Sequence, residues 1–391
     1  MTENARPQRP PRVIHIVESL DVGAVESWLL RMLEASHTFG EPVDWTFYSV
    51  LSRPGRFDDA ARKLGATVIN SPVELDRKLY FVRALRRTLR RGNYDVMHCH
   101  HDVVSAVYLV AAAGLRIPRT IVHVHNADLH VPTGSPLKSA LLREPMRQIC
   151  LRVASRIVGI SRYTLENFLR GRAPRAKRDL VLYYGIDTSL FQAPQPDALA
   201  MRRALGLPDD SRVLLFVGRM VSYKNPLFVL DVLAEIANAE PGVFAVFAGA
   251  GPLEHELRER ARERGLADRV RVLGWRDDTV ALMRCSDVFV FPRVERKTAK
   301  VGKEGLGLVV VEAQAAGLMS LLSRAIPDDA IVLPELCETQ SLDAGSAAWG
   351  AAVRGILAKP KPNQAAALAA VERSPFSLEA GFRNLVALHR P

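Results

Sequence analysis

The sequence lacks any apolar run of the roughly 18 residues that a membrane-spanning helix requires, so no such helix is expected. Cysteine is scarce: the chain of 391 residues has 4, scattered without the C-x-x-C spacing of redox or zinc sites. We therefore expect free thiols in a reducing compartment. Residues 1–12 have no apolar core, so we expect a disordered tail rather than a signal peptide.

Metal-binding patterns are also missing. No Asp-x-Asp pair stands at the end of an expected strand. Histidines cluster at the ends of two expected strands, and alternate histidines on one strand share a face, so zinc has to be considered. No carboxylate or cysteine completes a ligand set, so we predict no metal and interpret these histidines as hydrogen-bond partners. They are His98, His100, His101, His123 and His125.

Positive charge is plentiful but unevenly distributed. The net charge is +11, and residues 1–190 hold 28 Lys and Arg against 18 Asp and Glu. This excess predicts that the first half faces something anionic. Nucleic acid is not the expected partner, because the sequence has neither an RNA-binding aromatic signature nor a helix-turn-helix pattern. The basic residues gather on two expected helices, as Arg83, Arg86, Arg87, Arg90 and Arg91 on one, and Lys138, Arg143, Arg147 and Arg152 on the other.

Apolar β-type runs alternate with amphipathic helical runs along the whole chain. This rhythm predicts parallel sheets covered by helices on both sides, the α/β class. The alternation of strands and helices is interrupted near 184–211 by a linker that contains glycine and prolines. We therefore expect two doubly wound domains facing a central cleft. The expected divisions are a tail (1–12), an N-terminal domain (13–190), a C-terminal domain (191–375) and a last helix that packs back on the N-terminal domain (376–391).

One loop after an expected strand carries residues suited to a diphosphate. Gly218, Arg219 and Lys224 lie between the strand 213–217 and a helix that starts at Pro226. Two cations and the backbone N–H groups of a helix N-terminus together suit such a ligand. Two further strands end in turns. One carries Gly249 and Gly251, which permit a tight turn, and the other carries Trp275 and Arg276, which could hold a nucleobase.

The stretch KEGLGLVVVEAQAAG places two glutamates around two glycines and an apolar run. If a helix begins near Leu308, its first N–H groups can bind phosphate, and Glu312 lies one turn inside. Ribose hydroxyls would be natural donors to Glu312, while Glu304 stands in the preceding loop and can accept from sugar hydroxyls. The basic loop 293–303 is interpreted either as a segment that contacts a phosphate-bearing ligand or as a mobile lid.

These residues resemble the retaining GT-B glycosyltransferases of family 4, over nearly the whole chain. Glu304 to Glu312 matches their E-x7-E motif, Arg219 with Lys224 their diphosphate pair, and 249–253 their G-x-G-P-L turn. The N-terminal loop 21–26 and the junction 184–187 are also similar, with Ala24, Val25 and Tyr184 as departures. HVHN (123–126) and EAQAAGL (312–318) are closest to the exopolysaccharide and capsule assembly subgroup.

The resemblance implies roles for individual residues. Arg219 and Lys224 would stabilise the leaving nucleotide, Glu304 would hold the transferred sugar and His125 would bond a sugar hydroxyl. The other residues implied to contact the donor, several through backbone groups, are Gly23, Gly218, Gly249, Gly251, Trp275, Arg276, Gly305, Leu306, Gly307, Leu308 and Glu312.

The implied reaction moves a sugar from a nucleotide-diphosphate sugar to a hydroxyl with retention, without metal or cofactor. A UDP-sugar is favoured over a GDP-sugar. The acceptor would be a glycan or a lipid-linked (polyprenyl diphosphate) molecule in exopolysaccharide biosynthesis. The protein would be cytoplasmic and peripheral on the inner face of the membrane, with Arg83, Arg86, Arg87, Arg90, Arg91, Lys138 and Arg143 facing acceptor or anionic lipid. A non-catalytic GT-B partner subunit and a GT-B epimerase remain alternatives.

Overall fold

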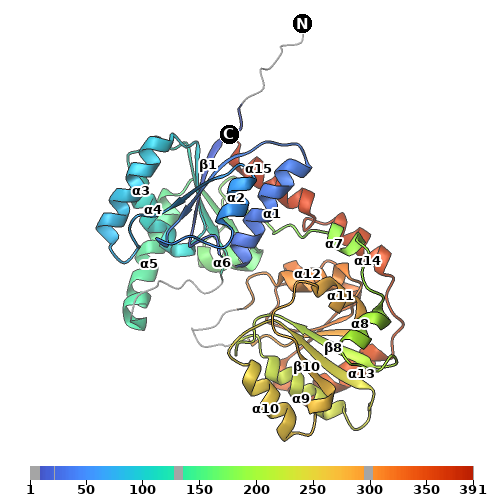
Figure 1. Ribbon diagram of the computed structural model, residues 1–391. Coiled ribbons are helices and arrows are strands. Elements are labelled where there is room, and N and C mark those ends of the chain that lie inside the picture. Colours follow the sequence, from blue (N-terminus) through green and yellow to red (C-terminus); the bar gives the residue numbers. More distant parts are fainter. Residues whose placement is uncertain (1–8, 22, 127–134, 295–302, 391) are drawn as a thin grey trace. The chain divides into compact units, whose positions relative to one another are not determined.

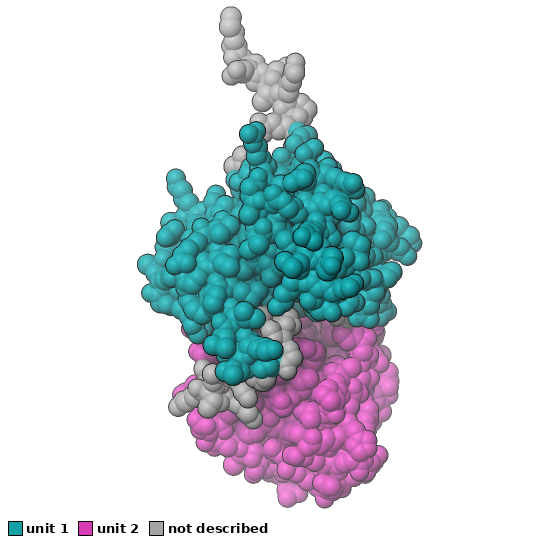
Figure 2. All heavy atoms as spheres, turned by 90° about the vertical axis from the view of Figure 1, so that its left-hand side faces the viewer, with its two compact units in different colours: residues 1–185, 378–391 teal, residues 186–377 magenta. Residues whose placement is uncertain are grey.

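The computed structural model describes residues 9–21, 23–126, 135–294 and 303–390. Most of the expected tail 1–12 and of the basic loop 293–303 therefore lies outside the described residues. The chain divides into two units, shown in Figures 1 and 2: residues 1–185 with 378–391 form unit 1, and residues 186–377 form unit 2. The expected boundaries, at 190/191 and 375/376, lie a few residues away.

Unit 1 contains a parallel sheet, seven-stranded in its described part, with the order β3-β2-β1-β4-β5-β6-β7. Its central strands are apolar runs buried on both faces, as a parallel sheet with helices on either side requires. The strands are β1 (Arg12–Val17), β2 (Asp44–Ser49), β3 (Thr67–Asn70), β4 (Val96–Cys99), β5 (Arg119–Val124), β6 (Arg156–Gly159) and β7 (Asp179–Val181).

The helices of unit 1 cover both faces of this sheet (Figure 1). Helices α3, α4 and α5 pack side by side, and α1 packs against α2 and α15. They are α1 (Ala24–Thr38), α2 (Asp58–Lys63), α3 (Lys78–Gly92), α4 (Ser105–Ala112), α5 (Pro136–Val153), α6 (Arg162–Leu169) and α15 (Leu378–His389). The last helix thus belongs to unit 1, where the rings of Phe382 and Phe39 lie 5.6 Å apart.

Unit 2 contains a second parallel sheet, six-stranded in its described part, with the order β10-β9-β8-β11-β12-β13. Its strands are β8 (Arg212–Val217), β9 (Val243–Ala248), β10 (Val270–Val272), β11 (Val288–Phe291), β12 (Ser320–Ser323) and β13 (Cys337–Gln340). Its helices are α7 (Ser189–Gln192), α8 (Ala198–Ala204), α9 (Pro226–Ile236), α10 (Glu254–Glu263), α11 (Thr279–Cys285), α12 (Leu308–Ala315), α13 (Gly345–Leu357) and α14 (Gln364–Glu372).

The expectation of two doubly wound α/β domains is confirmed. In each unit the loops that follow the strands gather at the carboxyl edge of the sheet, where such folds bind ligands. The cysteines are free, three of them buried and Cys337 half-buried. Among the described residues, no helix has the length and apolarity needed to cross a bilayer.

Candidate functional site

A cationic loop connects β8 to α9 in unit 2 and carries Arg219 and Lys224. The ammonium of Lys224 is largely buried; it lies 2.8 Å from Oε2 of Glu304 and 4.8 Å from the ring centroid of Phe291. The guanidinium of Arg219 is more exposed, and it donates to the hydroxyl of Tyr223. Both cations therefore lie in the loop at the carboxyl edge of the sheet, where burial lowers the pKa of Lys224 and the charge of Arg219 adds to this effect.

Glu304 is the anionic centre of this loop cluster. Its Oε2 accepts from Lys224 and also from Nε of Arg293. Its backbone N–H donates to the carbonyl of Ala325 at 2.8 Å, which fixes the loop before α12. Burial alone would raise the pKa of Glu304, but the two cations outweigh it and hold that pKa below its ordinary value. Glu304 is thus an ionised hydrogen-bond acceptor.

The glycines of the neighbouring loops let three backbone segments lie against one another. A Cβ on Gly249 would come within 2.0 Å of the carbonyl oxygen of Gly218, and one on Gly251 within 2.5 Å of that of Met220. Both glycines have positive φ, at 131° and 158°. The backbone N–H of Gly249 also donates to Gly274 at 2.7 Å. In this structure the glycines allow close packing of the loops, and contact with a ligand remains a prediction.

Helix α12 begins at Leu308, as expected. Gly307 precedes it with φ of 82°, a left-handed conformation that favours glycine. Glu312 is half-buried one turn inside the helix, and Gly305 lies in the loop before it. Leu306 is only 3% exposed, so its side chain belongs to the core. The structure leaves the implied contact of these residues with a nucleotide as a prediction.

The turn after β10 presents an aromatic ring to solvent. Trp275 is 70% exposed, whereas Arg276 forms a bidentate ion pair with Asp278 at 2.7 and 2.5 Å. An exposed indole at a strand end is available to stack on a planar ligand. Arg276 would have to leave Asp278 in order to contact that ligand.

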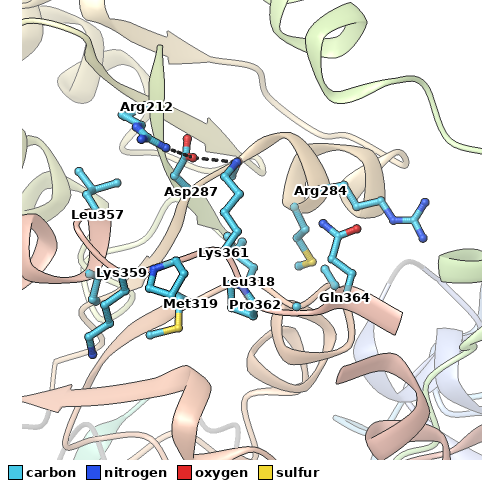
Figure 3. A pocket seen from close by; sticks show the side chains of 16 residues that line it. Arg212, Arg284, Asp287, Leu318, Met319, Leu357, Lys359, Lys361, Pro362 and Gln364 are labelled. Carbon is cyan, nitrogen blue, oxygen red and sulfur yellow. Dashed lines mark hydrogen bonds and ion pairs between the residues drawn. The ribbon is translucent and has the colours of Figure 1, made fainter. Parts of the chain in front are cut away.

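A compact pocket of about 40 Å³ lies at the opposite edge of the unit 2 sheet (Figure 3). The side chain of Asp287, which precedes β11, is 3% exposed there and pairs with Arg202, Arg212 and Lys361. Ligand pockets typically measure about 300–1,000 Å³. This pocket is far too small for a sugar nucleotide, and the carboxylate of Asp287 is already paired within the protein.

Six histidines form a buried cluster on one face of the unit 1 sheet. They come from β1, from β4 and the residue after it, from β5 and the residue after it, and from α15, as His15, His98, His100, His123, His125 and His389. Burial, together with the charges of neighbouring groups, lowers the pKa of each of them, to about 3 for His125 and His389. The cluster is therefore neutral at pH 7.

Hydrogen bonds join these rings into two chains. In one, His15 Nδ1 meets His100 Nε2 and His100 Nδ1 meets His125 Nε2, each at 3.0 Å, and His125 Nδ1 meets the hydroxyl of Tyr184. In the other, His389 meets His98 at 3.0 Å, and His98 meets His123 at 3.2 Å. A neutral imidazole has one donor and one acceptor. All rings of a chain must therefore share one tautomeric direction.

The ring nitrogens of two histidine trios lie within 4.8 Å of one another and have to be considered as metal ligands: His15, His98 and His100, and His100, His123 and His125. A chelate requires lone pairs that converge on one point. Here each hydrogen bond instead directs a proton of one ring at the lone pair of the next. The chain arrangement favours hydrogen bonding over a metal.

His125 is the last histidine of the first chain and lies at the carboxyl edge of the sheet. It is 6% exposed, and both of its ring nitrogens are engaged within the protein. Its backbone N–H donates to Asp102 at 2.7 Å, and Asn126 Nδ2 donates to the same carboxylate at 2.9 Å. A bond from His125 to a sugar hydroxyl would require one of its contacts to open, so that role remains a prediction.

Asp102 and Glu26 are residues of this edge to which sequence reasoning gave no role. Asp102 has φ of 43°, an uncommon conformation for a residue other than glycine, and burial raises its pKa to about 6 despite its hydrogen bonds. Burial raises the pKa of Glu26 to about 7, and Glu18 and Asp21 add to this. The Glu26 carboxylate lies over Gly23, where a Cβ would be 2.1 Å from Oε2. Gly23 therefore leaves room for Glu26.

The basic helices divide into exposed and internal residues. On α3, Arg83, Arg87, Arg90 and Arg91 are exposed, whereas Arg86 donates to the carbonyls of Ala111 and Ala113 at the end of α4. On α5, Lys138 and Arg152 are exposed and Arg143 is half-buried. The expectation that Arg147 lies on the outer basic face is wrong. It is 4% exposed, because it pairs with Glu144 and donates to the carbonyl of Phe168.

Arg293 pairs with Glu304 next to Lys224, but the sequence did not single it out as a site residue. It follows Phe291 and Pro292 at the end of β11, the kind of position that yielded the other site residues. In the sequence it is also the first residue of the basic loop 293–303, which hides this position. Its position directly after a strand was the signal that could have separated it from that loop.

Each half of the chain matches a known family of glycosyltransferases. Residues 29–190 match the family described as Glycosyltransferase Family 4, and residues 197–330 match Glycosyl transferases group 1. EpsF of Bacillus subtilis (strain 168), named as a glycosyltransferase, is 27% identical over 90% of this chain and 89% of its own length. A UDP-Gal:alpha-D-GlcNAc-diphosphoundecaprenol alpha-1,3-galactosyltransferase of Escherichia coli is 24% identical over 71% of this chain and 70% of its own.

Solved structures agree in fold. HepE of Anabaena, solved with UDP and glucose, superposes with a TM-score of 0.75 over 96% of this chain and 98% of its own, at 18% identity. The sucrose-phosphate synthase of Thermosynechococcus elongatus gives 0.74 at 20% identity, over 97% of this chain and 98% of its own. With one family match in each half and this fold throughout, the chain belongs to the GT-B glycosyltransferases of family 4.

Proposed function

We propose that this glycosyltransferase transfers a hexose from a nucleotide-diphosphate sugar to a hydroxyl, with retention and without a metal ion. The observation that carries the proposal is the pairing of Lys224 with Glu304 beside Arg219, at the carboxyl edge of the unit 2 sheet. Preorganised cations at a leaving diphosphate stabilise the charge that grows there in the transition state. We favour a UDP-sugar as donor, and the E. coli relative is named for UDP-Gal.

The ionisation and pairing of Glu304 bear on which group acts as the general base. A carboxylate that is paired with two cations and has a lowered pKa is a poor general base. It is better suited to accepting hydrogen bonds from the hydroxyls of the transferred sugar. We therefore assign deprotonation of the acceptor hydroxyl to the leaving phosphate, and charge stabilisation to Arg219 and Lys224.

Transfer assays with UDP- and GDP-hexoses, read by product anomeric configuration, test the reaction. Lys224→Ala and Arg219→Ala are each expected to lower kcat/KM by about 10²–10³-fold, the usual effect of removing a group that stabilises developing charge. Arg262→Ala, on the exposed face of α10, is the matched control. Activity is expected to survive EDTA. Full activity of both cation variants would reject this site, and lack of turnover with any nucleotide sugar would favour a non-catalytic partner subunit.

We further propose that the acceptor is lipid-linked, serves exopolysaccharide synthesis, and is met at the inner face of the cytoplasmic membrane. The E. coli relative is named for a diphosphoundecaprenol-linked acceptor. On α5 of this chain, Leu137 and Leu141 are 70% and 66% exposed beside Lys138. Exposed leucines with neighbouring cations suit the surface of an anionic bilayer.

Sedimentation with vesicles of anionic and of neutral phospholipid tests the membrane contact. Binding to anionic vesicles is expected to weaken with salt and with Leu141→Ser. The matched control is Leu190→Ser, an exposed leucine of α7 in unit 2. Equal binding of the Leu141 variant and the wild type, or binding that salt does not change, would refute the proposed surface.

A further inference from the structure

Arg293 is built into the carboxyl edge of the unit 2 sheet more firmly than a loop arginine normally is. It is 7% exposed, and its guanidinium donates to the carbonyls of Val294 at 3.0 Å and Lys303 at 3.3 Å. Its own carbonyl accepts from Ser323 Oγ, at the end of β12, at 2.7 Å. The residue is thus held both through its backbone and through its side chain.

The guanidinium of Arg293 reaches the same oxygen that Lys224 uses. Nε of Arg293 and Nζ of Lys224 both donate to Oε2 of Glu304. Glu304 therefore has two cationic partners at one atom. If only Lys224 were present, its movement toward another anion would leave a buried carboxylate unpaired, which is strongly unfavourable. With Arg293 in place, Glu304 remains paired with a cation when Lys224 moves toward another anion.

Tyr223 connects Arg293 to the remaining cation. The centre of the Arg293 guanidinium lies 5.0 Å from the Tyr223 ring, and that of Arg219 lies 5.6 Å from it. Three cations and the carboxylate of Glu304 leave two positive charges in this group. A nucleotide-diphosphate sugar carries one negative charge on each phosphate. Without Arg293, the charge of the group would fall short of that ligand.

We propose that Arg293 is a positioning residue for donor binding: it keeps Glu304 paired, so that Lys224 can turn from Glu304 to the diphosphate. The inference rests on the proposed function, because it takes the ligand of Lys224 to be a diphosphate. It assigns to Arg293 an action through Glu304 rather than a direct contact with phosphate. A direct contact is the competing account, and the two differ in what happens when Glu304 loses its charge.

Titration calorimetry with UDP and with GDP separates the two accounts. These ligands carry no transferred sugar, so the sugar-binding role of Glu304 does not enter the result. Arg293→Gln is expected to weaken binding of the preferred nucleotide by at least about tenfold. Glu304→Gln is expected to bind at least as tightly as the wild type. In the Glu304→Gln background, adding Arg293→Gln is expected to change Kd by less than about twofold.

Controls keep the outcomes distinct. Arg262→Gln, on the exposed face of α10, is expected to leave Kd unchanged. Arg293→Lys retains the charge and is expected to recover most of the affinity. If Arg293→Gln does not fold, Arg293→Met, which also removes the charge, replaces it in the cycle. A tenfold loss that persists in the Glu304→Gln background would overturn the inference in favour of direct phosphate contact. Wild-type binding of UDP or GDP that no Arg293 variant changes would overturn it outright. If the wild type binds neither nucleotide, the proposed function fails first.

Discussion

The hydroxyl of Tyr184 and Nδ1 of His125 are hydrogen-bonded in the interior of unit 1. Tyr184 is 4% exposed, and its ring also stacks on Trp28 at 4.7 Å. The tyrosine hydroxyl thus lies at the end of the histidine chain His15–His100–His125, where the direction of its hydrogen bond and the tautomer of His125 are coupled.

Tyr184→Phe is expected to destabilise unit 1 by about 1–3 kcal/mol, because it leaves a buried nitrogen of His125 without its partner. The same change should mix the tautomers of His125, visible in its ¹⁵N chemical shifts. Urea unfolding and NMR of the variant measure both effects. Tyr80→Phe, at a residue that is 60% exposed, is the control and should change neither. An unaltered His125 spectrum in Tyr184→Phe would contradict the coupling.

The buried histidines predict a specific sensitivity to acid. Their pKa values are lowered in the folded protein, whereas in the unfolded chain they lie near 6.5. The unfolded state therefore binds more protons as pH falls below about 6.5, and stability decreases down to the folded pKa of about 3 for His125 and His389. Each such histidine contributes a loss of about 1.4 kcal/mol per pH unit in that window.

Urea unfolding between pH 7 and pH 4.5 measures this loss. His389→Gln is expected to reduce the slope of stability against pH by about 1.4 kcal/mol per unit below pH 6. Substitution of His255, an exposed residue of α10, is the control for the loss of a histidine side chain at the surface. A slope that is identical in wild type and His389→Gln would show that His389 does not stay neutral.

Gly249 and Gly242 form a matched pair, one on each side of β9. Gly249→Ala places a Cβ within 2.0 Å of a backbone oxygen at a φ of 131°, so the loops after β8 and β9 must separate. A new Cβ on Gly242 would meet no atom within 4 Å. We expect Gly249→Ala to lower stability by about 1–3 kcal/mol and to weaken nucleotide binding, and Gly242→Ala to do neither. Thermal unfolding measures the stability of each variant, and UDP titration measures its nucleotide affinity. Equal stability and equal affinity of the two variants would refute the packing role of Gly249.

Arg86 and Arg87 are neighbours on α3 with different predicted roles. Arg86 donates to two carbonyls at the end of α4, at 3.0 and 2.6 Å, whereas Arg87 is exposed. Arg86→Ala is therefore expected to lower the free energy of unfolding by about 1–3 kcal/mol. Arg87→Ala should leave stability unchanged and weaken binding to anionic vesicles. The reverse pattern in unfolding and sedimentation would contradict this division.

The order of strands and helices could be read from the sequence, since buried parallel strands are continuous apolar runs. The expected strand 213–217 is found as β8, which starts one residue earlier at Arg212. The short edge strands β3, β7 and β13 were not expected. Edge strands bury less side-chain surface, so their apolar pattern is weak, as the half-exposed residues of Thr67–Asn70 show.

Some features of the candidate site could likewise be predicted from the sequence, and others could not. The sequence by itself determined which residues stand after strands, because that depends on local order, and this placed Arg219, Lys224 and Glu304 at one edge of the sheet. Only the tertiary structure decided that Arg293 and Lys224 share one oxygen of Glu304, and that Arg147 is buried. It also decided that six histidines, from strands and a helix far apart in the chain, line up as hydrogen-bonded chains. Such relations depend on distances between side chains that pack from different elements, and no local pattern in a sequence encodes them.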